Sequence, residues 1–155
     1  MIHYPTYKKK RLFEYRILHE KKQNLTILMY VYTDVIDIYD GNYNLISRIH
    51  GPERFMPELI QNGNQFAVSP DITKFAYVRG CVSENAIWVL FYNDHPKKGS
   101  DLLDVILCFD LSGNPLKMYK LDMPIMSFCV NEKEKCIYGI SEAPERCVTK
   151  YYFDN

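Results

Sequence analysis

The sequence predicts an all-β protein with the plan of a partial β-propeller, in which about three four-stranded antiparallel blades follow one another. A strand-turn-strand pattern at residues 66–78 recurs 62 residues later at residues 128–140. A second pattern, at residues 35–45, is echoed 70 residues on at residues 105–116. The chain also holds 13 Tyr and 8 Phe, residues that favour pleated, half-buried surfaces. Repeats of this length are typical of stacked or radial architectures.

Four strands are predicted in the first blade-like unit, residues 12–50, because apolar and polar residues alternate between clusters of turn residues. They span residues 12–18, 25–32, 35–39 and 45–49. Gly41 and Asn42 lie in the turn between the last two strands and tolerate the positive φ that tight hairpins need.

The second unit, residues 65–121, is predicted to hold strands at residues 65–69, 74–79, 105–109 and 116–121. An insertion separates its second and third strands. The apolar half of this insertion, residues 86–92, is expected to form an extra strand, and the polar half, residues 93–101, a loop. Loops of this length on a rigid scaffold are either functional or mobile.

The third unit, residues 125–153, has only three predicted strands, at residues 125–130, 135–140 and 147–153. A blade without its outer strand leaves a row of unpaired backbone groups, which invites another segment to pair with it. We expect residues 2–7 to supply that strand.

Composition limits the partners. The sequence of 155 residues is 47% hydrophobic and 25% charged, which predicts one soluble globular domain over residues 1–155. Lys plus Arg and Asp plus Glu both number 19, so no net field recruits nucleic acid. No apolar run is long enough to span a membrane, and residues 1–10 lack the order of a signal peptide. As given, the chain is expected to be cytoplasmic, or periplasmic or at the cell surface if it is a fragment of a longer exported protein.

Two motifs carry a family resemblance. Phe-Ala-Val-Ser-Pro-Asp at residues 66–71 is combined with the strand-turn sequences at residues 36–40 and 107–114. This combination resembles the TolB-like six-bladed β-propellers, especially uncharacterised bacterial members, over roughly residues 25–153. The resemblance implies that residues 68–71 end an inner strand, that residues 75–77 belong to the second strand, and that residues 109–115 turn from the third to the fourth.

The chain also departs from that family. Six blades of ~40–50 residues need about twice this length. Closed propellers have four to eight blades, so three blades do not close a ring alone. Two interpretations stay open at this point: the chain is the C-terminal half of a longer propeller, or it forms a homodimer in which two halves complete a six-bladed ring.

No catalytic, cofactor or metal site is predicted. Asp34, Asp37 and Asp40 lie close enough in sequence to suggest calcium, but strand alternation and Asx turns favour turn and surface roles. The four histidines lack ligand spacing, and nucleophile and phosphate-binding motifs are missing from the sequence. We therefore predict no cofactor and favour a protein that is not an enzyme.

One interaction surface is predicted on and after the insertion strand, because aromatic anchors dominate interfaces. Its residues are Trp88, Tyr92, Asp94, His95, Lys97 and Lys98. Core packing of the extra strand explains the aromatic residues equally well.

A disulfide is a further candidate. If residues 131–134 form a hairpin loop, Cys129 faces Cys136 across the ladder. The favoured alternative is two reduced, half-buried thiols.

These observations predict a non-catalytic binding or scaffolding module of the TolB-like propeller type, with its interaction surface on loops at one end of the blades. The ligand, protein or small molecule, is not identified by the sequence. One alternative is a metal-assisted hydrolase or lactonase of the kind that some six-bladed propellers resemble. Its inner strands would offer Glu14, Arg16, Gln65 and Ser127. Another alternative is a fragment with no independent function.

Overall fold

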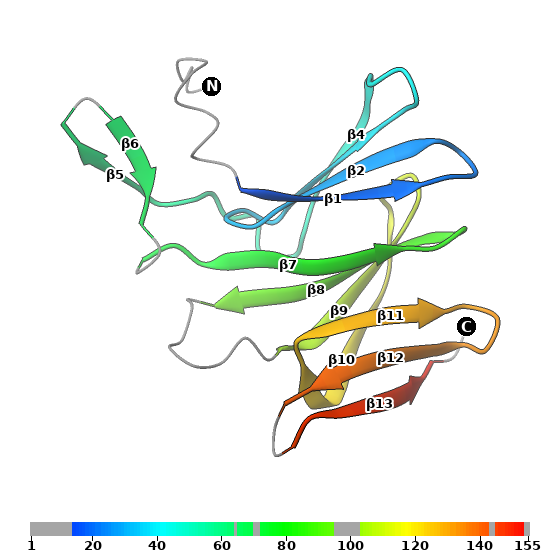
Figure 1. The fold of residues 1–155 in the computed structure, drawn as a ribbon. Coiled ribbons are helices and arrows are strands. Elements are labelled where there is room, and N and C mark those ends of the chain that lie inside the picture. Colours follow the sequence, from blue (N-terminus) through cyan, green and yellow to red (C-terminus); the bar gives the residue numbers. More distant parts are fainter. Residues whose placement is uncertain (1–13, 64, 70–71, 95–102, 143–144, 154–155) are drawn as a thin grey trace.

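The computed structural model describes residues 14–63, 65–69, 72–94, 103–142 and 145–153, and these residues form thirteen strands and no helix. The strands make two sheets of four strands, one of three and one of two (Figure 1). All pairings are antiparallel. The predicted fold class, an all-β propeller-like fragment, is confirmed, and the sheets do not close into a ring.

The first blade has the strand order β1-β2-β3-β4, as the sequence predicts. Its strands are β1 (Tyr15–Glu20), β2 (Leu25–Tyr30), β3 (Val35–Tyr39) and β4 (Leu45–His50). The turn between β3 and β4 is held by Asp40, whose Oδ1 accepts hydrogen bonds from the backbone amides of Asn42 and Asn44 at 2.8 and 2.9 Å. This is the Asx turn expected at Asp40.

The second blade differs from the prediction. It consists of β7 (Phe75–Val82), β8 (Ala86–Asp94), β9 (Leu103–Asp110) and β10 (Pro115–Ile125), in that order. The supposed extra strand is therefore β8, the second strand of the blade, and β7 is the inner strand and not the second. The turn between β9 and β10 repeats the first-blade turn, with Asp110 Oδ1 accepting from Ser112 and Asn114 at 2.9 and 2.8 Å.

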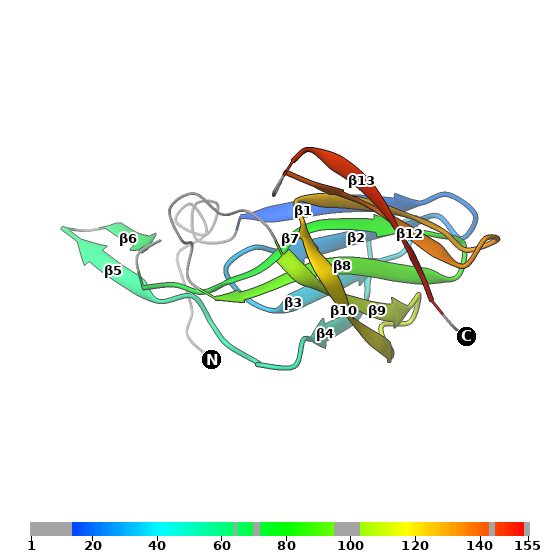
Figure 2. The ribbon, with the colours of Figure 1, turned by 90° about the horizontal axis from the view of Figure 1, so that it is seen from below.

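The predicted first strand of that blade lies elsewhere. β6 (Gln65–Val68) pairs with β5 (Leu59–Asn62) in a two-stranded hairpin that extends beyond the blades (Figure 2). Gly63, with φ of +60°, makes the tight turn between them. The inner-strand role that the resemblance assigned to residues 68–71 is thus wrong for residues 68 and 69, while residues 70 and 71 lie outside the described part. The inner edge of the blade is β7, where the Ala76 amide donates to the Val31 carbonyl oxygen of the first blade at 2.7 Å.

The third blade has three strands, as expected: β11 (Ser127–Asn131), β12 (Cys136–Ser141) and β13 (Cys147–Tyr152). Residues 2–7, expected to add a fourth, lie outside the described residues. The proposed facing of Cys129 and Cys136 is wrong. Cys129 pairs with Tyr138 and Cys136 with Asn131, because the hairpin loop spans residues 132–135 and Lys135 takes a positive φ of 51°. Both cysteines are free thiols.

The second blade lies between the other two and has both faces covered. Alternate side chains of β8 point to opposite faces. Ile87, Val89 and Phe91 join the first-blade residues in one hydrophobic core. Trp88 and Leu90 join the third blade in a second core. The inner strands β1, β7 and β11 lie side by side and run in the same direction, with β7 packed between its two neighbours (Figure 1).

The described residues contain no helix suited to crossing a membrane.

Candidate functional site

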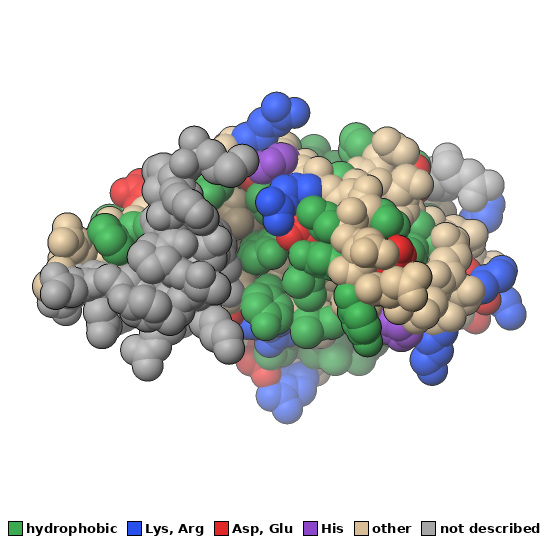
Figure 3. All heavy atoms as spheres, turned by 90° about the horizontal axis from the view of Figure 1, so that it is seen from above, with side chains coloured by type: hydrophobic (Ala, Val, Ile, Leu, Met, Phe, Trp, Pro, Cys, Tyr) green, Lys and Arg blue, Asp and Glu red, His purple; other side chains and the backbone are tan. Residues whose placement is uncertain are grey.

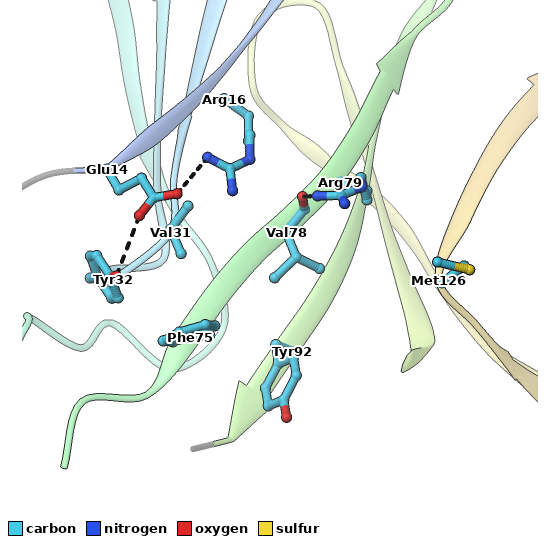
Figure 4. A pocket seen from close by; sticks show the side chains of 9 residues that line it. All are labelled: Glu14, Arg16, Val31, Tyr32, Phe75, Val78, Arg79, Tyr92 and Met126. Carbon is cyan, nitrogen blue, oxygen red and sulfur yellow. Dashed lines mark hydrogen bonds and ion pairs between the residues drawn. The ribbon is translucent and has the colours of Figure 1, made fainter. Parts of the chain in front are cut away.

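A cleft of about 280 Å³ opens where the inner strands of the three blades meet (Figure 4). Side chains reach it from strands β1, β7 and β8, from the residues that precede β1 and β11, and from the connection between β2 and β3. They are Glu14, Arg16, Val31, Tyr32, Phe75, Val78, Arg79, Tyr92 and Met126. Residues of all three blades thus converge on one concave region.

A bulged stretch of β7 directs two neighbouring residues of that strand to the cleft. In an even strand, consecutive side chains point to opposite faces. The β7–β8 register shifts on both sides of Tyr77, between Phe75 and Tyr77 and again between Tyr77 and Arg79. Bulges of this kind re-aim side chains. Val78 and Arg79 both line the cleft as a result.

Three aromatic rings form one wall. Tyr32 and Phe75 meet edge to face, with ring centroids 5.2 Å apart. Phe75 and Tyr92 are tilted at 57° with centroids 5.8 Å apart. Such contacts stabilise the arrangement of the rings. The wall therefore presents a preformed apolar surface that Figure 4 shows along one side of the site.

Two arginines and one carboxylate supply the charge. Glu14 accepts from Arg16 at 2.7 Å and from the Tyr32 hydroxyl at 3.4 Å. Burial, and then the nearby Glu14 carboxylate, raise the pKa of Tyr32 above its ordinary value, so this phenol stays protonated as a donor. The Arg79 guanidinium donates to the Val78 carbonyl oxygen at 2.8 Å. Among the described residues no carboxylate lies within ion-pair distance of Arg79.

The structure places the residues of the predicted interaction surface in different environments. Trp88 is only 3% exposed and stacks on Tyr119 with centroids 5.7 Å apart, so its assignment to a surface is corrected: it packs in the core. Tyr92 lines the cleft, and Asp94 pairs with Phe75 at the end of β8. His95, Lys97 and Lys98 lie outside the described residues.

Six residues of the cleft, among them Tyr32, Phe75 and Arg79, were not singled out as site residues by the sequence. Tyr32 follows β2 and Phe75 begins β7, and their contact depends on how the two blades are packed. The basic residue that ends the apolar run at residues 75–78 was the available signal for Arg79. Glu14 and Arg16, named as inner-strand residues, do line the cleft.

Two of the three clustered aspartates are buried, contrary to the turn and surface roles expected for them. Asp37 is fully buried and accepts two hydrogen bonds from Arg48, at 2.6 and 2.7 Å. Asp34 Oδ2 accepts from the backbone amides of Glu53 and Arg54 at 3.0 and 2.6 Å, which fixes the crossover after β4. Both carboxylates therefore serve the fold of the first blade.

The described part of the chain contains no group of three or more His, Cys, Asp or Glu side chains placed to hold a metal ion.

Comparison with known proteins gives three results. No curated protein matches the sequence. A solved structure that matches, the crystal structure of the computationally designed Ika4 protein, shares 12% identity over 89% of each chain, with a TM-score of 0.39. Residues 5–133 match the family described as TolB-like 6-blade propeller-like. Because that match covers most of the sequence, the chain belongs to the TolB-like six-bladed propeller-like family.

Proposed function

We propose that the protein is a non-catalytic binding module that holds a ligand in the cleft between its inner strands. The ligand carries a carboxylate or a similar planar anion next to an apolar group. The observation that supports this most strongly is the position of Arg79 beside the aromatic wall, without a carboxylate partner among the described residues.

Each part of the cleft matches one part of such a ligand. The rings of Tyr32, Phe75 and Tyr92 offer an apolar contact surface. A guanidinium has five N–H donors in a planar fork that fits a carboxylate with two parallel hydrogen bonds. At about 280 Å³ the cleft is slightly smaller than most small-molecule sites, which span roughly 300–1,000 Å³. It therefore suits a small ligand or one side chain of a peptide.

The test uses two probes that differ only in charge, N-acetylphenylalanine and its neutral amide, N-acetylphenylalaninamide. Their binding is followed by two-dimensional NMR of the isotope-labelled protein. We expect the carboxylate to bind about tenfold or more tightly than the amide, since charged hydrogen bonds each contribute roughly 1.5–3 kcal/mol. Shifted resonances should belong to residues that line the cleft.

The Arg79→Ala variant should remove the preference for the carboxylate. Arg146→Ala is the matched control, because Arg146 is exposed, pairs with Glu142 and lies outside the cleft. Equal binding of the two probes, or loss of the preference in the control variant, would contradict the proposal. The alternative of a metal-assisted hydrolase is favoured by no arrangement among the described residues.

A further inference from the structure

Among the residues that the structure describes, nothing covers the outer faces of the first and third blades. The first blade covers one face of the second blade, and the third blade covers the other. The first-blade face is the side of β1–β4 that points away from the second blade. Opposite residues in antiparallel strands share a face, so the row Ile17, Leu28, Asp37 and Arg48 runs across it. Tyr15, Tyr30 and Ile46 flank that row.

The opposite end of the stack has a similar surface. The third-blade face is the side of β11–β13 that points away from the second blade, and it carries Cys129, Tyr138, Ile140, Val148, Lys150 and Tyr152. Large apolar side chains are exposed on both faces. On the first-blade face Ile17 is 60% exposed, and on the third-blade face Val148 is 68% exposed. Figure 3 looks onto the first-blade side and shows hydrophobic side chains gathered at its centre.

The charges at the centres of both faces are already neutralised. On the first-blade face Arg48 is bound to the buried carboxylate of Asp37. On the third-blade face the Lys150 ammonium lies 2.8 Å from Glu134 and 4.9 Å from the centroid of the Tyr152 ring. A cation that is paired and flanked by tyrosine can enter an interface without leaving a lone buried charge. Tyr and Arg are also enriched in protein interfaces.

The junctions within the chain indicate which surface fits each face. We call the face of a blade that points toward the next blade in the sequence its trailing face, and the opposite face its leading face. At both junctions the trailing face of one blade packs on the leading face of the next. The first blade leaves a leading face uncovered, and the third blade leaves a trailing face uncovered. The matched family has six blades, and the structure describes three. A head-to-tail contact whose rotation closes generates a ring.

We propose that two copies of this chain associate head to tail, the third-blade face of each docking on the first-blade face of the other. This arrangement covers both faces in both copies at two identical junctions. It also places β1, β7 and β11 of the two copies around one axis. The occupant of each face is thus a second copy of the chain.

The first test is the mass of the 155-residue chain in solution, measured by light scattering over a wide dilution series. We expect a dimer of about twice 18.3 kDa. Ile17→Asp and Val148→Asp should each give a monomer, because each variant alters both junctions. Met118→Asp is the matched control, since Met118 is 66% exposed on strand β10 and lies on neither face. All three side chains are exposed, and circular dichroism checks that each variant is folded.

Mixing the two monomeric variants tests the head-to-tail geometry. A heterodimer of Ile17→Asp with Val148→Asp has one junction with both substitutions and one with neither. The mixture should therefore recover dimers that neither variant forms alone. A dimer of first-blade face on first-blade face would not respond to Val148→Asp, and that result would overturn the proposal.

A wild-type chain that stays monomeric at every concentration would also overturn it, and would assign both faces to blades of another polypeptide. The proposal does not rest on the ligand site. Binding of N-acetylphenylalanine can be measured on the monomeric Ile17→Asp variant, so failure of the dimer and failure of the binding function give different results.

Discussion

The first and second blades have the same strand order and the same turn between the third and fourth strands, but their second strands differ in burial. In β2, fully buried residues alternate with half-buried ones. In β8, every residue from Ala86 to Phe91 is buried. Among the described residues of one chain, the difference follows from the number of covered faces, which is one for the first blade and two for the second. The continuous apolar run at residues 86–91 therefore matches a strand whose two faces are both covered within the chain.

The largest difference is expected from truncating one leucine in each of the two second strands. Leu90 is fully buried between the second and third blades. Leu90→Ala should lower the free energy of unfolding by ~2–5 kcal/mol, because it leaves a cavity. Leu28 is half-buried on the first-blade face, and Leu28→Ala should lower it by less than about 1.5 kcal/mol. Urea unfolding in the monomeric Val148→Asp background measures both, and equal losses would show that the two faces are equally covered within one chain.

The sequence predicted the presence of three blades better than it predicted which strands form each blade. The first-blade strands were predicted because each is bounded by turn residues and carries at least one polar residue. Residues 86–92 lack polar positions, and alternation cannot show that both faces of such a strand are buried. Residues 65–69 contain most of the propeller motif, but β6 pairs with β5 and not with a blade. Only the three-dimensional structure shows that partner. The cleft was missed because Tyr32 and Phe75 meet across two blades.

The turn of the second blade should be less tolerant of substitution than another glycine turn. Gly113 has φ of +94°, and an added Cβ would clash with the Ile49 side chain of the first blade. We expect Gly113→Ala to destabilise the protein by ~1–3 kcal/mol. Gly63 is the matched control, with φ of +60° and open space around its Cα. Thermal unfolding should show a smaller loss for Gly63→Ala, and equal losses would mean that the clash with Ile49 is relieved by movement.

Acid should weaken the β3–β4 turn at Asp40 and the β9–β10 turn at Asp110 in the same way. Hydrogen bonds from the Asn114 side chain and nearby backbone amides hold the pKa of Asp110 below its ordinary value. The folded pKa is the lower one, so this stabilisation is present above the unfolded value of about 3.9 and is lost as the pH falls through the folded pKa. The difference in urea midpoint between wild type and Asp110→Asn should therefore narrow in acid. Asp40→Asn should behave alike, and a difference that is constant with pH would contradict this account.

The smallest effect concerns the first-blade counterpart of Gly113. Tyr43 occupies the same turn position with φ of 64° and is 80% exposed. Tyr43→Gly should raise the free energy of unfolding by about 0.5 kcal/mol, because relief of the left-handed strain exceeds the entropy that glycine loses on folding. Thermal unfolding is the measurement, with Asn42→Gly in the same turn as the control. A loss of stability in Tyr43→Gly would show that the tyrosine ring makes a stabilising contact.

The position of β8 also has a consequence for aggregation. Its core, Ile-Trp-Val-Leu-Phe-Tyr at residues 87–92, combines high β-propensity with an absence of charge and proline. Six-residue segments of this kind are the signature of the steric zippers that build amyloid fibrils. In the folded protein both faces of the segment are covered. One of its edges pairs with β7 and the other with β9. A substitution that loosens either outer blade therefore exposes a fibril-forming segment, and such variants should aggregate well before they are fully unfolded.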